Sequence, residues 1–245
     1  NDCDWLVSCT RANVAHLAGL AGRPERVELV YHGLDFSAFP PPGARRPPRR
    51  GGDGDDPVVI LSVGRGVDKK GYKGLLDALA LVDKDLHWRF VHIGGGPGIA
   101  ALRGRSERLG LAGRVAWLGP QAQRTVIENY RAADIFVLAC RISADGDRDG
   151  LPNVLMEAQS QELPCLSTTV SGVPELIADG EQGLLVPPDD APALAAGLER
   201  LIGDPGLRRR LGAAGRRRLQ AAFSHQAGID KLAAKFGLPA NTKER

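Results

Sequence analysis

The sequence predicts an α/β domain built on a doubly wound parallel sheet. Strand and helix patterns alternate from residue 58 to residue 169. The strand segments are almost continuously apolar, as in VVILSV (58–63) and IFVLAC (135–140), which indicates burial on both faces and therefore parallel pairing. Glycine-rich or acidic turns follow several of these strands, where such sheets bind their ligands.

Each element follows from a local pattern. DWLVSC (4–9) is a short apolar strand, Thr10 is a cap for a helix over 10–20, and RVELVYHG (26–33) is a second strand. PPPGARRPPRRGGDGDDP (40–57) predicts a linker or flexible loop, since it holds no apolar residue beyond one Ala. We then expect strands at 58–64, 87–94, 114–119, 134–140 and 163–169, and helices at 74–82, 100–110, 124–133 and 153–161. The tail over 191–236 reads as helical, interrupted by GDPG (203–206) and by the cap candidate Ser224.

Composition excludes several classes of protein. A net charge of +3 is too small to imply nucleic-acid binding, and aromatic and basic residues do not interleave. Apolar runs stay below the roughly 18 residues that span a bilayer. The four cysteines, Cys3, Cys9, Cys140 and Cys165, lack C-x-x-C spacing, which favours reduced thiols in a cytoplasmic protein. The start lacks both Met and a secretory signal pattern, so we interpret the sequence as a piece of a longer chain.

The stretch DGDRDGLPN raises the question of a metal. Asp145, Asp147 and Asp149 match the start of a calcium loop, but Met156 stands where the bidentate Glu belongs and Glu157 comes one residue late. The segment before it reads as a strand, whereas a calcium loop needs a helix there. Calcium is therefore disfavoured. The D-x-D could hold a metal on a sugar-nucleotide diphosphate, and a charged surface loop is the simpler alternative.

The turn GRGVDKKG after the strand at 58–64 carries two cations. Arg65 and Lys70 lie five residues apart, so their side chains can converge on a diphosphate. A P-loop is not present, because Tyr72 rather than Lys follows Gly71. A solvated turn whose glycines only permit tight bending is the alternative.

The other two turns offer backbone groups. HIGGGPG (92–98) does not complete G-x-G-x-x-G, because Ile99 stands at the third glycine position; it permits close ligand approach or is a simple tight turn. Pro152 suits the first position of a helix, and that helix start would present free N–H groups and a positive dipole to a phosphate.

These residues carry a family resemblance. DGLPNVLMEAQSQELPCLSTTVSGVPELIADGEQGLLVPPDD (149–190) resembles the signature of the retaining family 4 glycosyltransferases with the GT-B fold, in which two acidic residues separated by seven others bracket a turn and a helix start. VGRGVDKKGYKGLLDALALV, IGGGPGIAALR, RVAWLG and NYRAADIFVLA extend the resemblance upstream in the family's order. It covers roughly residues 1–235.

The resemblance implies roles for single residues. Arg65 and Lys70 match the cations on the donor diphosphate, Asp149 the acid on the donor sugar, and Glu157 the acid on the ribose. The first acid is usually Glu, so the shorter Asp149 changes the reach to the sugar. We expect further donor contacts from Gly64, Gly66, Gly94, Gly95, Gly150, Leu151, Pro152, Asn153, Gly172, Glu175 and, near the base, Gln121.

The resemblance also implies an organisation and a function. Residues 1–38 match the last elements of an acceptor domain, 39–57 a linker, 58–222 a Rossmann-like donor domain and 223–245 a C-terminal helix and tail. The expected activity is retaining glycosyl transfer from a nucleotide sugar in bacterial polysaccharide or glycolipid synthesis, with no metal or other cofactor and with the acceptor bound by a preceding domain. A non-catalytic nucleotide-binding module and a sugar-nucleotide epimerase remain alternatives. The basic clusters at 45–50 and 208–218 leave weak membrane association at the inner face open, against a solvated helix face.

Overall fold

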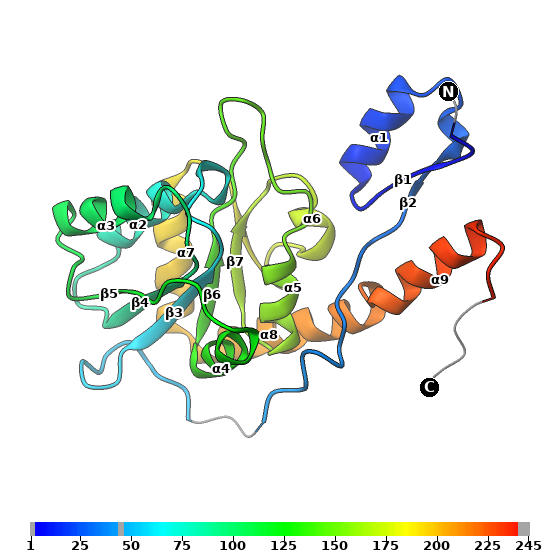
Figure 1. The fold of residues 1–245 in the computed structure, drawn as a ribbon. Helices are drawn as coiled ribbons and strands as arrows, with labels where there is room; N and C mark the ends of the chain where they lie inside the picture. The colour runs from blue at the N-terminus through cyan, green and yellow to red at the C-terminus, as the bar shows by residue number, and fades with distance from the viewer. Residues whose placement is uncertain (1–2, 44–46, 240–245) are drawn as a thin grey trace.

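The computed structural model describes residues 3–43 and 47–239, and its centre is a six-stranded parallel sheet (Figure 1). The strand order is β5-β4-β3-β6-β7-β8, and every neighbouring pair is parallel. The chain therefore enters in the middle, winds to one edge, returns and winds to the other, which makes β3 and β6 the switch point of a doubly wound sheet. The strands are β3 (Val58–Val63), β4 (Trp88–Ile93), β5 (Val115–Trp117), β6 (Ile135–Leu138), β7 (Cys165–Thr168) and β8 (Gly183–Val186).

The predicted parallel sheet is confirmed, with the burial that its apolar strands imply. All four residues of β6 and all four of β7 are buried, because helices cover both faces of the sheet. The short strand β8 was not expected, since its four residues lie between two turn sequences and are too few to show a period. It adds the last strand at one edge.

Helices cover the two faces of the sheet in separate groups (Figure 1). On one face, α2 (Tyr72–Leu81) packs against α3 (Ile99–Arg108) and α7 (Ala191–Gly203). On the other, α5 (Asn153–Ser160) packs against α8 (Pro205–Ala222), and α4 (Gln123–Ala132) lies beside them. The expected break at 203–206 is confirmed, because Asp204 ends α7 and accepts the N–H of Leu207 to cap α8. The short helix α6 (Val173–Leu176) was not predicted.

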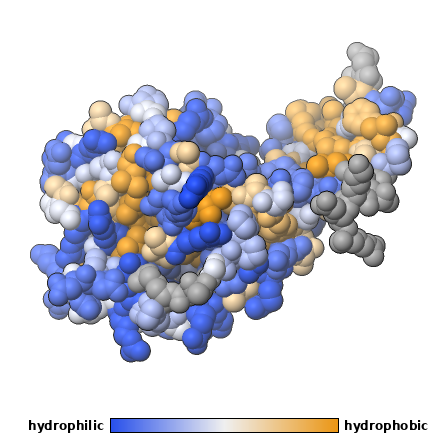
Figure 2. Space-filling model, turned by 60° about the horizontal axis from the view of Figure 1, so that its bottom comes forward, coloured by the Kyte–Doolittle hydropathy of each residue, from blue (hydrophilic) through white to orange (hydrophobic). Residues whose placement is uncertain are grey.

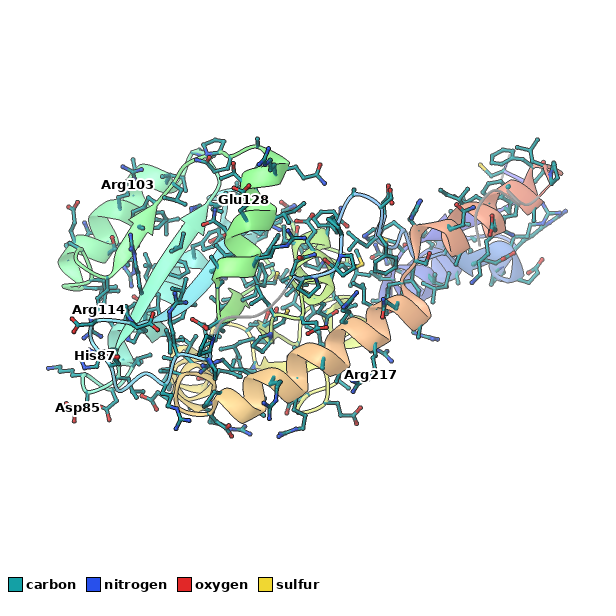
Figure 3. The ribbon with its side chains drawn as sticks, turned by 90° about the horizontal axis from the view of Figure 1, so that it is seen from below. Asp85, His87, Arg103, Arg114, Glu128 and Arg217 are labelled. Carbon is teal, nitrogen blue, oxygen red and sulfur yellow. The ribbon has the colours of Figure 1, made fainter. Side chains whose placement is uncertain are left out.

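A smaller lobe stands beside this domain. It holds a parallel pair, β1 (Leu6–Ser8) and β2 (Val27–Leu29), joined through α1 (Arg11–Leu20) and the 3₁₀ turn η1 (Pro24–Arg26). Thr10 caps α1 as expected, accepting the N–H of Asn13 at 3.2 Å. The last helix, α9 (His225–Lys235), lies along this lobe rather than on the sheet (Figure 3). We call residues 3–34 together with 225–238 the N-terminal lobe.

Contacts between distant parts of the sequence hold the N-terminal lobe together. Phe236 packs edge-on against Trp5 with ring centroids 5.1 Å apart, and Lys235 pairs with Glu28. Leu20 and Phe236 are 73% and 67% exposed, and hydrophobic residues gather on this lobe in Figure 2. The described part of the chain contains no helix with the length and apolarity that crossing a membrane requires.

The expected linker has no helix or strand in its described part, and it bonds to the sheet domain at several points. Gln161 donates to the carbonyl of Pro40 at 3.0 Å, Arg49 pairs with Asp134 at 2.8 Å, and the carbonyl of Gly51 accepts the N–H of His87 at 2.7 Å. The segment therefore follows the amino ends of the central strands.

Some arginines of the two predicted basic clusters bond to other groups of the protein. Arg45 and Arg46 lie outside the described residues. Arg208 is 5% exposed and donates to the carbonyls of Leu201 and Ile202, while Arg216 pairs with Glu162 at 3.1 Å. The exposed arginines of α8 are Arg209, Arg210 and Arg217, the last labelled in Figure 3.

Candidate donor site at the carboxyl ends of the strands

The turns after β3 and β4 fit together through glycines. A Cβ at Gly94 would lie 2.0 Å from the carbonyl oxygen of Gly64, and Gly66 donates its N–H to the carbonyl of Gly95 at 2.7 Å. A Cβ at Gly66 would lie 2.6 Å from the Ile99 side chain. These predicted site glycines are thus required by close contact between turns, which accounts for them without a ligand.

Gly71 brings the turn after β3 to the end of β6. It adopts φ +66°, and a Cβ there would lie 1.7 Å from the carbonyl oxygen of Ala139. The residues before it form a 3₁₀ turn, η2 (Asp68–Lys70), whose ammonium groups reach the loop that follows β6. The switch point is therefore closed by direct contact between its two turns.

An ion-pair cluster crosses the switch point. Lys70 Nζ lies 2.6 Å from Asp149 Oδ2, and both side chains are mostly buried, with 13% and 16% exposed. Lys69 Nζ lies 3.0 Å from Asp147 Oδ1 and 3.8 Å from Asp149 Oδ1. The Cys140 thiol lies beneath, 3.8 Å from Asp149 Oδ2, and burial followed by the charge of Asp149 raises its pKa to about 12. The structure thus brings together the predicted cation and acid.

The start of α5 faces the same edge with open N–H groups. Pro152 is the N-cap, with φ −68° and ψ 119°, so the helix begins at Asn153, as the range 153–161 predicted, and Pro152 precedes its first position rather than occupying it. The N–H of Leu155 bonds to the carbonyl of Pro152 at 3.1 Å, whereas those of Asn153 and Val154 have no partner among the described residues. A helix start of this kind attracts an anion.

Glu157 lies in the second turn of α5 and is held by a tyrosine of α4. The Tyr130 hydroxyl donates to Glu157 Oε2 at 2.9 Å. Burial raises the pKa of Glu157, while the Tyr130 hydrogen bond and the charge of Lys70 oppose that rise. Burial also raises the pKa of Tyr130 well above its usual range, so the hydroxyl stays a donor. One carboxylate oxygen is fixed, and the other has no protein donor among the described residues.

A cluster of aromatic rings lies under the turns after β3 and β4. The rings of Tyr72 and His92 meet edge-on at 4.6 Å, and His92 also packs on Trp117 at 5.0 Å. A Cβ at Gly64 would lie 2.7 Å from the Tyr72 hydroxyl, so this ring supports the turn directly. Burial lowers the pKa of His92 to about 4 and raises that of Tyr72, which keeps both groups neutral near pH 7.

The remaining residues predicted to contact the donor have different surroundings in the structure. Arg65 is exposed, and no acidic side chain of the described residues pairs with it. Gln121 is exposed and donates to the carbonyl of Leu118 at 2.7 Å. The N–H of Gly172 bonds to the carbonyl of Gly150 at 2.8 Å, which links the turn after β7 to the predicted sugar turn, where Leu151 is buried.

The predicted donor contact Glu175 is turned toward the N-terminal lobe. Its carboxylate accepts the N–H of Arg11 at 2.8 Å and the hydroxyl of Tyr31 at 2.7 Å. The resemblance placed this acid beside the donor, and the structure assigns it partners that the sequence did not suggest.

The acidic loop at 145–149 carries its own internal bonds. Asp147 donates its N–H to Asp145 Oδ1 at 3.0 Å, and the segment before the loop is β6, a strand. No group of three or more His, Cys, Asp or Glu side chains suited to a metal occurs among the residues that the structure describes. The geometry visible in the loop is that of carboxylates paired with lysines.

Sequence reasoning missed Lys69 and Tyr130. Lys69 adjoins Lys70 in the same turn, so the doubled lysine was an available signal. Tyr130 offered none, because only the packing of α4 on α5 shows that its hydroxyl reaches Glu157.

Comparison with known proteins shows which family has this sequence. Residues 47–218 match the family described as glycosyl transferases group 1. The chain is 33% identical over 196 residues to a putative colanic acid biosynthesis glycosyltransferase, WcaL, of Salmonella typhimurium, covering 80% of this chain and 47% of WcaL. It is 30% identical over 220 residues to a GDP-mannose-dependent phosphatidylinositol monomannoside mannosyltransferase of Mycolicibacterium smegmatis, covering 88% and 57%. The chain thus spans about half the length of these curated relatives.

Solved structures share the fold. HepE from Anabaena, solved in complex with UDP and glucose, superposes with a TM-score of 0.80 at 20% identity, covering 96% of this chain and 63% of HepE. A sucrose-phosphate synthase from Thermosynechococcus elongatus gives 0.79 at 25% identity, covering 96% and 58%. With the family match over most of its length, this chain belongs to the glycosyl transferases group 1 family and has the α/β architecture of the GT-B glycosyltransferases.

Proposed function

We propose that this chain binds the nucleoside-diphosphate sugar of a retaining glycosyltransferase and provides its donor half. The observation that carries the proposal is the Lys70–Asp149 pair at the switch point, beside the open N–H groups of α5. Doubly wound sheets bind their ligands at such a point. The family match and neighbours solved with UDP support a nucleotide sugar as the ligand.

In this proposal, positive groups act on the leaving diphosphate. Lys70, Arg65 and the start of α5 would bind the phosphates, and their effect would be largest in the transition state, where negative charge develops on the leaving group. Asp149 would bind sugar hydroxyls and Glu157 the ribose, so both position the donor. These fixed charges would make a divalent metal unnecessary.

The acceptor and the cellular setting are part of the same proposal. The relatives include enzymes named for colanic acid and lipopolysaccharide core synthesis, which supports a bacterial polysaccharide or glycolipid as the acceptor, reached through a preceding domain on the cytoplasmic side. Arg209, Arg210 and Arg217 support weak attraction to an anionic inner membrane surface. Co-sedimentation with anionic vesicles at low salt tests this membrane association. If the chain stayed in the supernatant, membrane association would be ruled out.

Calorimetric titration tests the donor proposal. UDP, GDP, ADP and NAD are titrated in chelator and again with Ca²⁺, against the parent and the Arg65→Ala and Glu157→Ala variants. Arg217→Ala, on the exposed face of α8, is the matched control for a lost guanidinium. We expect one nucleoside diphosphate to bind in chelator, with weaker binding in both site variants only. If none of the nucleotides bound, or if binding required Ca²⁺, the donor proposal would be overturned.

A further inference from the structure

The N-terminal lobe touches the sheet domain directly beside the predicted sugar turn. A Cβ at Gly172 would lie 2.6 Å from Thr10 Cγ2 and 2.8 Å from the carbonyl oxygen of Gly150. A Cβ at Gly150 would lie 3.6 Å from the same Thr10 methyl group and 3.7 Å from Cys9 Sγ. Thr10, only 1% exposed, therefore fills the gap between the turns after β6 and β7.

Glu175 ties this contact together. Its side chain is 11% exposed, and its carboxylate accepts two hydrogen bonds, from the first helical N–H of α1 and from Tyr31, both in the N-terminal lobe. Its own carbonyl accepts a hydrogen bond from Arg218 of α8 at 2.6 Å. The residue is thus fixed to the sheet domain by its backbone and to the lobe by its side chain.

The chain crosses between the N-terminal lobe and the sheet domain at two neighbouring places, Leu34 and Ser224, which form an isolated parallel bridge. The N–H of Leu34 bonds to the carbonyl of Phe223 at 2.8 Å, and the Tyr31 ring packs on Phe223 at 4.6 Å. Arg218 lies over the Phe223 ring at 5.9 Å. Glu175 therefore bonds to Tyr31 and Arg218 beside this crossing, and through the start of α1 it is also joined to Thr10 at the donor edge.

We propose that Glu175 is a positioning residue that docks the N-terminal lobe on the donor edge, so that Thr10 holds the turn beginning at Asp149 and Gly150 in its ligand-binding shape. The consequence for the donor rests on the function proposed above, whereas the docking does not. Because Tyr31 and the start of α1 satisfy both carboxylate oxygens, Glu175 acts through these contacts rather than on the donor.

Hydrogen exchange at the Arg11 amide measures the docking without any ligand. A hydrogen bond to a carboxylate is strong enough that removing it should speed exchange about tenfold or more in Glu175→Ala. Tyr31→Phe, which deletes only a hydroxyl, should change exchange in the same direction. Glu181→Ala removes an exposed acid further along the same segment and should leave the rate unchanged. Equal Arg11 exchange in the parent and Glu175→Ala would overturn the docking role.

Disulfide trapping gives a second measure of the same contact. In a Cys3→Ser, Gly150→Cys protein, oxidation should join the new cysteine to Cys9, because a Cβ at position 150 lies 3.7 Å from that sulfur. Adding Glu175→Ala should slow the reaction severalfold. An unchanged trapping rate would contradict the proposal.

Nucleotide binding then tests the link to the donor. Coupling is reciprocal, so a nucleoside diphosphate that binds the parent should slow Arg11 exchange, and Glu175→Ala and Tyr31→Phe should both weaken its affinity. If no nucleotide binds the parent, the donor proposal fails while the exchange result stands. If affinity falls in Glu175→Ala but not in Tyr31→Phe, Glu175 contacts the donor directly and the positioning role is overturned.

Discussion

Replacing Tyr130 with Phe removes one buried hydroxyl from Glu157 and should make the protein's stability more dependent on pH. The hydroxyl donates at 2.9 Å to a carboxylate whose pKa burial has already raised. A hydrogen bond to a charged group contributes about 1.5–3 kcal/mol. We expect Tyr130→Phe to cost more at pH 7 than at lower pH, up to about that amount, because the ionised fraction of Glu157 rises with pH.

The direction of the pH dependence follows from the direction in which the pKa of Glu157 is shifted. Because the pKa of Glu157 is higher in the folded than in the unfolded state, its contribution to stability is fully present below about 4.5, its unperturbed value, and is lost as pH rises through the folded pKa. Losing the Tyr130 hydrogen bond raises the folded pKa further. The destabilisation should therefore shrink as the pH falls to 4.5, where the carboxyl is about half protonated in the unfolded state and more than half protonated in the folded state.

Urea unfolding of the parent and Tyr130→Phe at pH 7 and pH 4.5 measures this difference. Tyr72→Phe is the matched control, because its buried hydroxyl is hydrogen-bonded to the Ser62 hydroxyl at 3.4 Å and not to a carboxylate. The control should cost less and about equally at both pH values. If Tyr130→Phe lost the same free energy at both, the assigned charge on Glu157 would be wrong.

The other predictions concern Lys70 of the ion-pair cluster, Gly71 and His92. Lys70→Ala should weaken nucleoside diphosphate binding by about 10- to 100-fold in calorimetry, because it removes a charged hydrogen-bond donor from the phosphates; unchanged affinity would exclude Lys70 from the site. Gly71→Ala should destabilise the protein by more than about 2 kcal/mol in urea unfolding, since φ is +66° and a carbonyl oxygen lies 1.7 Å from the new Cβ. Gly74→Ala, inside α2 with open space around it, should be neutral or stabilising by about 0.5–1 kcal/mol, and equal effects of the two substitutions would refute the argument. His92, with its pKa lowered to about 4, contributes stability above pH 6.5 that is lost as pH falls toward 4, by up to about 3 kcal/mol. His92→Leu should flatten that loss in unfolding experiments at a series of pH values, and an unchanged slope would show that His92 does not titrate there.

Local patterns were enough to predict most of the fold. The apolar strands around 58–63 and 135–138 imply burial on both faces, Thr10 marks a helix start and GDPG (203–206) marks a break between helices, because these signals depend on neighbours in sequence. The strand β8 was missed because four residues carry too little of a period. The pattern also predicted that the chemically important turns follow the carboxyl ends of the strands, since ligands bind at that edge of a parallel sheet.

The pairing of side chains was decided only by the tertiary structure. Lys70 and Asp149 are far apart in sequence and meet because Gly71 lets one turn close on the other. Tyr130 reaches Glu157 only because α4 packs beside α5. The same holds for Glu175, whose partners in the N-terminal lobe the sequence did not suggest: a carboxylate's partners depend on which elements pack around it, and a sequence motif fixes only its place in the chain.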